Sequence, residues 1–235
     1  MNLKRFLKHL LLNIRNGFIK TESIFSSKSK WDELAKENAE YYIWSDKKDP
    51  SPKEFRNSGS RDYRKYIKED DLLQEKLKIL KTRIALEIGC GIGRITEFLG
   101  EDFEKVYGVD ISSEMIRRAK GRLPGAKFVF IENDGLTVPL ESESIDFVFS
   151  FIVFQHMPSF KTVESNFKEA NRVLKRNGIF KVQLRGNLVD KKEWFYGVGF
   201  NRKGALKLAE RTNFKVLNFH KETERYSWLL LQKSN

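Results

Sequence analysis

The chain has 235 residues, of which 40% are hydrophobic, 13% aromatic and 32% charged. Because 19 phenylalanines, four tryptophans and seven tyrosines supply ample material for a core, this composition excludes a disordered chain. A single cysteine, Cys90, excludes a disulfide framework, and with only three scattered histidines we expect no metal site. No apolar run approaches the roughly 20 residues that span a bilayer. We therefore expect a reduced, cytoplasmic protein with one large domain and an appendage.

The positive charge is concentrated at the start of the chain. The net charge is +12, and residues 1–30 carry seven basic side chains against one acidic one, which is half of the excess. These residues are predicted to form a basic amphipathic extension, whose apolar stripe can pack on the main domain or on a second subunit. Alternatively, residues 1–20 can lie on the surface of an anionic membrane. The stripe comprises Leu3, Phe6, Leu7, Leu10, Leu11, Ile14 and Phe18.

The next part of the chain, residues 31–82, is predicted to form a helical lid or cap. Its aromatic residues Trp31, Tyr41, Tyr42 and Trp44 are candidates for the wall of a ligand site. The polar run before it is typical of a linker, and a later run rich in Lys, Asp, Ser and Pro is typical of a loop. The expected order is a linker over 26–30, a helix from 31 to 44, a loop over 45–62 and a helix over 63–80.

From residue 83 onwards, short apolar runs alternate with amphipathic helices. This alternation predicts an α/β fold with a doubly wound, mostly parallel seven-stranded sheet, closed by a C-terminal antiparallel hairpin and preceded by the helical extension. The expected strands are 83–88, 105–109, 127–131, 145–153, 179–184, 215–220 and 226–232. The expected helices are 93–99, 113–123, 162–174 and 202–211.

The first two strands end in a pattern that favours a ligand site. Gly89, Gly91 and Gly93 follow the first strand at alternate positions and permit a sharp turn against a ligand. Asp110 ends the next strand, 21 residues after the first glycine. An acidic residue at that distance can accept hydrogen bonds from both hydroxyls of a ribose. Ligands of such sheets bind at the carboxyl ends of the strands, where the strand order reverses.

Together with Glu87, these residues resemble the glycine loop and acidic residue of the class I S-adenosylmethionine (SAM)-dependent methyltransferases, in their small-molecule branch. The dehydrogenase fingerprint fails, because its last glycine position holds Arg94 or Thr96. The resemblance covers roughly residues 80–233 and implies a Rossmann-like domain over residues 83–235. Downstream segments that match the family's later strands and turns are 132–134, 144–150 and 172–179.

The resemblance implies SAM as cofactor and S-adenosylhomocysteine as product, with no metal. By resemblance, Glu87 orients the loop or the ammonium group of the ligand, Asp110 holds the ribose and Asp134 accepts from the adenine amino group. Ile111 and Met115 are expected against the adenine, and Ser150 and Phe151 beside the methyl group. The residues carried over as cofactor-binding are Glu87, Gly89, Cys90, Gly91, Gly93, Asp110, Ile111, Met115, Asn133, Asp134, Ser150 and Phe151.

Methyl transfer needs alignment and exclusion of water, and it needs a base only where the acceptor loses a proton. His156, which follows the fourth strand, is the candidate catalytic base, because an ordinary histidine titrates near pH ~6.5. A loop-capping or substrate-binding histidine is the alternative. A second aromatic cluster expected near the acceptor comprises Trp194, Phe195, Tyr196 and Phe200.

The expected function is methyl transfer from SAM to an oxygen or nitrogen of a small-molecule, lipid-linked or glycan acceptor. Alternatives are a SAM-binding protein without methyl transfer, or an RNA methyltransferase. A nucleic-acid partner is disfavoured, because the segment after the fourth strand lacks the Asn/Asp-Pro-Pro-Tyr motif of amino-directed nucleic-acid methyltransferases. The pattern leaves the oligomeric state open, and it allows a location peripheral to the membrane.

Overall fold

The computed structural model describes residues 26–80, 83–186 and 197–234. Most of the predicted N-terminal extension, including its apolar stripe, lies outside the described residues. The same holds for Trp194, Phe195 and Tyr196 of the predicted second aromatic cluster.

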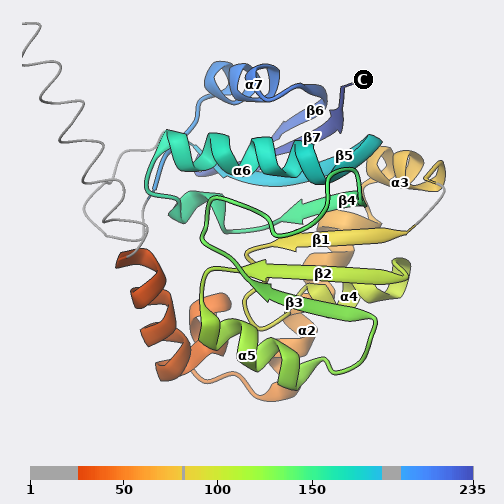
Figure 1. The fold of residues 1–235 in the computed structure, drawn as a ribbon. Coiled ribbons are helices and arrows are strands. Elements are labelled where there is room, and N and C mark those ends of the chain that lie inside the picture. Colours follow the sequence, from red (N-terminus) through yellow and green to blue (C-terminus); the bar gives the residue numbers. More distant parts are fainter. Residues whose placement is uncertain (1–25, 81–82, 187–196, 235) are drawn as a thin grey trace, which may run out of the picture.

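A seven-stranded sheet forms the centre of the described structure, in the order β3-β2-β1-β4-β5-β7-β6 (Figure 1). Neighbouring strands from β3 to β5 pair in parallel, whereas β7 pairs antiparallel with both β5 and β6. The predicted fold class is therefore confirmed, including the C-terminal hairpin. The strands are β1 (Ile84–Ile88), β2 (Lys105–Asp110), β3 (Phe128–Glu132), β4 (Ile145–Ser150), β5 (Leu174–Arg185), β6 (Phe214–Lys221) and β7 (Tyr226–Lys233).

The central strands are apolar on both faces because helices cover both sides. Every residue of β4 is buried. Phe147 and Phe149 belong to one hydrophobic cluster, and Val148 between them belongs to the cluster on the opposite side. Because alternate side chains point to opposite faces, a strand between two helical layers reads as a continuous apolar run.

One helical layer contains α6 (Phe160–Val173) and α7 (Arg202–Arg211), which lie alongside β5 and β6 (Figure 1). The other contains α2 (Pro52–Tyr63), the π-helix η1 (Arg64–Lys68), α3 (Asp71–Lys78) and α4 (Thr96–Asp102). A helix over residues 26–43, α5 (Ser113–Arg122) and the 3-10 turn η2 (Phe154–His156) complete the described elements. No helix in these described ranges combines the length and apolar character that crossing a membrane requires.

Two expectations about the N-terminal half are wrong. Residues 26–30 are not a linker, since they form the first turns of the helix over 26–43. The expected loop over 45–62 contains α2, which begins with a capping box: the Glu54 amide donates to the Ser51 hydroxyl, and the Ser51 amide donates to the Glu54 carboxylate at 2.9 Å. Pro52 occupies the first helical position, where a missing N–H costs nothing. The polar composition of residues 45–62 therefore predicted a loop where the structure has a helix.

Candidate functional site

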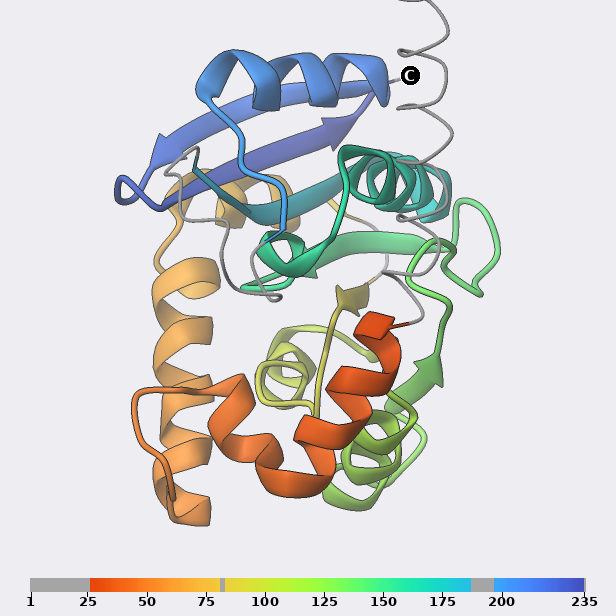
Figure 2. The ribbon, with the colours of Figure 1, turned by 90° about the vertical axis from the view of Figure 1, so that its left-hand side faces the viewer.

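A cavity opens at the carboxyl ends of β1, β2, β3 and β4, which include the point where the strand order reverses between β1 and β4. The helix over residues 26–43 crosses these ends, and Figure 2 views the molecule from that side. The cavity encloses about 1110 Å³ of space, part of it open to solvent.

The glycine loop forms the floor of the cavity at β1. Gly89 and Gly91 line it, with φ of 73° and 54°, in the left-handed region that favours glycine. A Cβ at position 89 would lie 2.3 Å from Val153 Cγ2, and one at position 91 would lie 2.7 Å from Ile43 Cδ1. Gly93 lies outside the lining and closes the turn by donating its N–H to the Cys90 carbonyl at 2.9 Å. The loop is therefore held by neighbours that leave no room for side chains.

Asp110 fastens this loop to the end of β2. Its Oδ2 accepts from the Gly91 N–H at 2.9 Å, and its Oδ1 accepts from the Ser112 N–H at 2.9 Å. Burial raises the pKa of Asp110 above its usual range, although these amides favour the charged form. Each carboxylate oxygen can accept a second hydrogen bond, and the side chain lines the cavity.

An oppositely charged pair, Glu87 and Arg94, lies at the loop end of the cavity. Burial raises the pKa of Glu87 to about 7, with the Thr96 hydroxyl and Arg94 favouring its charged form. Arg94 donates from Nη1 to Asp62 Oδ2 at 2.7 Å, and it is 4% exposed. Its Nε is the single buried side-chain nitrogen or oxygen without a hydrogen-bond partner in the described part of the chain. A buried donor of this kind can donate a hydrogen bond to a ligand, a water molecule or an ion.

Sequence reasoning missed Arg94, treating it only as a failed glycine position. Its place directly after Gly93 was the available signal, because a residue that follows the loop turns towards the same cavity. The partner that fixes it, Asp62, comes from α2, and no local pattern links the two.

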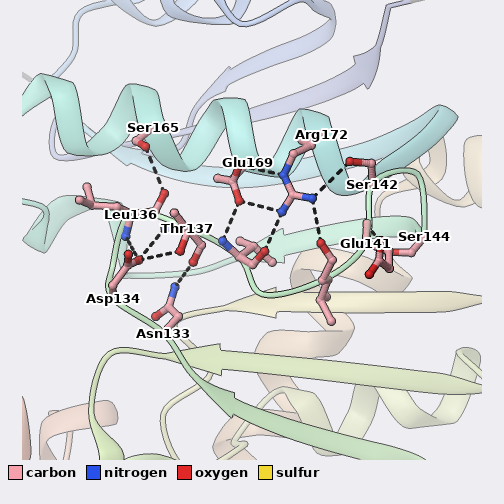
Figure 3. A network of polar contacts seen from close by, with 12 residues as sticks. Asn133, Asp134, Leu136, Thr137, Glu141, Ser142, Ser144, Ser165, Glu169 and Arg172 are labelled. Carbon is pink, nitrogen blue, oxygen red and sulfur yellow. Dashed lines mark hydrogen bonds and ion pairs between the residues drawn. The ribbon is translucent and has the colours of Figure 1, made fainter.

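Past β3, the structure brings Asn133 to the cavity and leaves Asp134 outside the lining. Asp134 Oδ1 accepts from the amides of Leu136 at 2.8 Å and Thr137 at 2.7 Å (Figure 3). Asn133 donates its side-chain amide to the Thr137 carbonyl at 2.8 Å. Gly135 completes this side of the cavity. Asp134, which the resemblance places beside the adenine, therefore accepts hydrogen bonds from the backbone of its own turn.

This turn is held by α6. Arg172 donates to the carbonyls of Val138 at 2.7 Å and Leu140 at 2.8 Å, while Glu169 accepts from the Val138 amide at 2.8 Å (Figure 3). Two side chains of α6 thus satisfy the backbone of a connection that forms no helix of its own.

Of the predicted cofactor-binding residues near the ends of β1, β2 and β4, some line the cavity and one holds two strands together. Ile111, Met115, Cys90 and Phe151 line the cavity. Ser150 does not, because its hydroxyl is buried and donates to the Ile88 carbonyl at 2.8 Å, joining the ends of β4 and β1.

His156 also lines the cavity. Its ring meets Trp31 edge-on, with centroids 5.3 Å apart and planes at 72°. Its Nε2 lies 3.0 Å from Gln155 Nε2. Because an amide nitrogen only donates, this contact makes Nε2 the unprotonated ring nitrogen.

The helix over 26–43 supplies the remaining wall through Trp31, Tyr42 and Ile43, whereas Tyr41 and Trp44 lie outside the lining. Asp32 anchors this helix to the start of α5, where its Oδ1 accepts from the Ser112 hydroxyl at 2.6 Å and the Glu114 amide at 3.1 Å. Of the second predicted aromatic cluster, the structure describes Phe200, which is buried against Phe160 and does not line the cavity.

Part of the chain, including most of the residues that line this cavity, is similar to known proteins. Residues 86–182 match the family model described as a methyltransferase domain. A trans-aconitate 2-methyltransferase from Afipia carboxidovorans is 35% identical over 120 residues, which cover 50% of this chain and 44% of that protein. One from Rhizobium rhizogenes is 32% identical over 113 residues, covering 46% and 42%. The chain thus spans less than half the length of these relatives.

Solved structures share the fold. A SAM-dependent methyltransferase from Methanosarcina mazei is 22% identical with a TM-score of 0.58, covering 70% of this chain and 97% of that one. A protein from Pyrococcus horikoshii is 23% identical with a TM-score of 0.60, covering 74% and 91%. The [4+2]-cyclase SpnF is 15% identical with a TM-score of 0.58, covering 70% and 79%. Residues 86–182 thus match a methyltransferase domain, and the sheet order agrees with the fold of these solved structures.

Proposed function

We propose that this protein transfers the methyl group of SAM to an oxygen or nitrogen atom of a small-molecule acceptor. The observation that carries the proposal is the cavity lined by the glycine loop, Asp110 and Arg94, whose Nε is buried without a hydrogen-bond partner. The trans-aconitate 2-methyltransferases, named for a small acceptor, support the small-molecule class.

The polar groups of the cavity fit SAM by their chemistry. Arg94 offers a buried donor to the ligand's carboxylate, and Glu87 offers an acceptor to its ammonium group. Asp110 has acceptor capacity left for ribose hydroxyls. Ile111 and Met115 supply an apolar surface for the adenine, and Asn133 supplies an amide. Asp134 is a weaker candidate than Asn133, because its Oδ1 already accepts three hydrogen bonds from its own turn.

When bound, SAM supplies a methyl carbon activated by its sulfonium. The chain then has to orient the acceptor in line with that carbon and keep water out. Helix 26–43 covers the strand ends and Asp32 anchors it, which serves the exclusion of water. His156 accepts a proton where the acceptor must lose one.

Other functions from the sequence remain alternatives. Transfer to a lipid-linked or glycan acceptor, with residues 1–20 on a membrane surface, depends on a segment outside the described residues. The cyclase named above has this fold, so a SAM-binding protein without methyl transfer is the principal rival. RNA methylation draws only on the net charge of +12.

Calorimetry with SAM, S-adenosylhomocysteine and NAD tests the proposal on the full chain. We expect both SAM-related ligands to bind and NAD to give no heat. Incubation with SAM and a pool of small acceptors should then yield S-adenosylhomocysteine. NAD binding without SAM binding contradicts the cofactor, whereas SAM binding without turnover of any acceptor favours the rival.

A further inference from the structure

Asp32 links the helix over residues 26–43 to the segment that follows β2. Its Oδ1 accepts hydrogen bonds from the Ser112 hydroxyl at 2.6 Å and from the Glu114 amide at 3.1 Å. The Ser113 hydroxyl donates to the same oxygen at 3.3 Å. Asp32 and Ser112 are 80 residues apart in the chain. The carboxylate therefore holds a helix from the N-terminal part of the chain against the start of α5.

Ser112 passes this contact on to Asp110. It is fully buried, and both its hydroxyl and its amide have partners. The hydroxyl donates to Asp32, and the same oxygen accepts from the Met115 amide at 3.1 Å. The Ser112 amide donates to Asp110 Oδ1 at 2.9 Å. Because a buried residue with satisfied hydrogen bonds has little freedom to move, the position of Asp110 depends on Asp32.

The same helix reaches Asp110 by a second route. The other carboxylate oxygen of Asp110 accepts from the Gly91 amide at 2.9 Å. Ile43, at the end of the helix, packs so closely on Gly91 that a Cβ there would lie 2.7 Å from Ile43 Cδ1. Between these two ends, two fully buried alanines of the helix share a hydrophobic cluster with Ile92 and Met115. The helix therefore contacts both segments whose amides hold the Asp110 carboxylate.

The charge of Asp32 is an independent observation. Desolvation raises the pKa of Asp32, but the hydrogen bonds from Ser112 and its neighbours outweigh this effect and hold the pKa below its ordinary value. The pKa of Asp110 is raised mainly by burial, and the charge of Asp32 adds to the rise. Placing two carboxylates so close together costs free energy, and such pairs are typical of functional sites.

We infer that Asp32 is a positioning residue for the ribose site, which sets the place of the Asp110 carboxylate through Ser112. Docking of the helix over 26–43 and binding of the ribose hydroxyls of SAM then favour each other. The inference rests on the proposed function, in which Asp110 accepts from those hydroxyls. The coupling is reciprocal, because a ligand that binds better when the helix is docked also stabilises the docked helix.

The test compares S-adenosylhomocysteine with its 2′,3′-dideoxy analogue, in which hydrogen replaces both ribose hydroxyls, by calorimetry on the full chain. The parent protein should bind the analogue about tenfold more weakly or worse, because it loses hydrogen bonds to a charged acceptor. In Asp32→Ala this preference for the hydroxyls should fall at least about threefold. If Asp32→Ala weakens both ligands by the same factor, Asp32 only holds the helix and the inference is overturned.

Glu33→Ala is the matched control. Glu33 is an exposed carboxylate on the same helix and pairs only locally, with Lys30 at 3.1 Å. Its loss should leave the preference for the hydroxyls within about twofold of the parent value. If Glu33→Ala lowers the preference as much as Asp32→Ala does, the effect comes from the charge of the helix and the inference is overturned.

Ser112→Ala removes the hydrogen bond to Asp32 from the other side. It should lower the preference for the hydroxyls by a similar factor, and it serves in place of Asp32→Ala if that variant does not fold. The protein with both substitutions should lose little more than either one, because both remove the same interaction. Losses that simply add would show that Asp32 does not act through Ser112.

Hydrogen exchange tests the reciprocal effect. S-adenosylhomocysteine should slow the exchange of the backbone amides of residues 26–43 more than the dideoxy analogue does at equal saturation. In Asp32→Ala the two ligands should protect these amides equally. Equal protection by both ligands in the parent protein overturns the coupling.

Failure of the inference and failure of the proposed function are distinguishable. If S-adenosylhomocysteine binds and the parent protein shows no preference for the ribose hydroxyls, the inference fails and the proposed function stands. If neither SAM nor S-adenosylhomocysteine binds, the proposed function itself fails and the inference fails with it.

Discussion

The loops after β1 and β4 reach the same cavity from neighbouring strands, but they are built differently. The β1 loop uses glycine wherever φ is positive, so its sharp turn costs little. The β4 loop places Ile152 at φ 58°, where glycine would be unstrained. Val153 of the β4 loop fills the space that a side chain at Gly89 would need. One loop lets backbone approach a ligand, and the other presents side chains to it.

The largest expected effect comes from forcing the β1 loop to carry a side chain. Gly89→Ala adds left-handed strain of about 1–2 kcal/mol and overpacking against Val153 of about 1–3 kcal/mol. We expect the free energy of unfolding in urea to fall by about 2–5 kcal/mol. Val153→Ala in the same chain removes the clash and should restore part of the loss. A double variant no more stable than Gly89→Ala would show that the two loops are not in contact.

Glu87, just before the β1 loop, predicts a dependence of stability on pH. Burial raises its pKa to about 7 in the folded protein, whereas the unfolded chain ionises near the ordinary value of 4.5. The folded state therefore holds a proton that the unfolded state has lost, and stability should fall as pH rises from about 4.5 to 7, by up to about 3 kcal/mol. Glu87→Gln should remove this part of the slope in urea unfolding curves. If the stability of the parent protein and of Glu87→Gln depends on pH in the same way, the prediction is wrong.

Asp110→Ala tests the link between the β1 loop and the end of β2. Loss of a charge-assisted hydrogen bond costs about 1.5–3 kcal/mol, so calorimetry should show S-adenosylhomocysteine binding ten- to several hundredfold more weakly, in a folded protein. Asp134→Ala is the matched control, because Asp134 lies outside the lining and should have a smaller effect on affinity. If Asp134→Ala weakens S-adenosylhomocysteine binding more than Asp110→Ala does, Asp134 contacts the adenine after all.

Arg94→Lys tests whether Arg94 binds the carboxylate of the ligand. Lysine keeps the charge beside Asp62 but lacks Nε, so S-adenosylhomocysteine should bind about tenfold more weakly. Methylthioadenosine lacks the amino-acid group and serves as the control ligand. Its affinity should not change. Equal losses for both ligands would place Arg94 away from the carboxylate.

The smallest effect is expected in the β4 loop. Ile152→Gly relieves strain of about 1–3 kcal/mol but adds about 0.5–1 kcal/mol of backbone entropy cost and loses side-chain contacts, so we expect a gain in stability of about 0.5–1 kcal/mol. Asn177→Gly, at φ 63°, is the control, because asparagine tolerates this conformation and should gain less. Equal thermal shifts for both would mean that Ile152 is not specially strained.

Local patterns predicted a large part of this protein. The strand and helix alternation predicted the sheet and its hairpin, and the glycine spacing with Asp110 predicted which strand ends meet. The spacing of Ser51 and Glu54 is that of a capping box and indicates the start of α2. The polar composition around it favoured a loop instead, and that prediction was wrong. The helical turns at residues 26–30 were not predicted, because their serines and lysines are typical of a linker and only the structure shows Lys28 paired with Glu132 far along the chain.

By itself, the sequence determined the α/β fold, the glycine loop and the position of Asp110, because these follow from periodicity and from backbone conformations that few residues allow. Only the tertiary structure decided that Arg94 keeps a buried donor free, that Asn133 rather than Asp134 reaches the cavity, and that Trp31 meets His156. Each of these depends on a partner distant in sequence or on the direction in which one turn folds. Contacts of that kind arise from packing, which no window of the sequence contains.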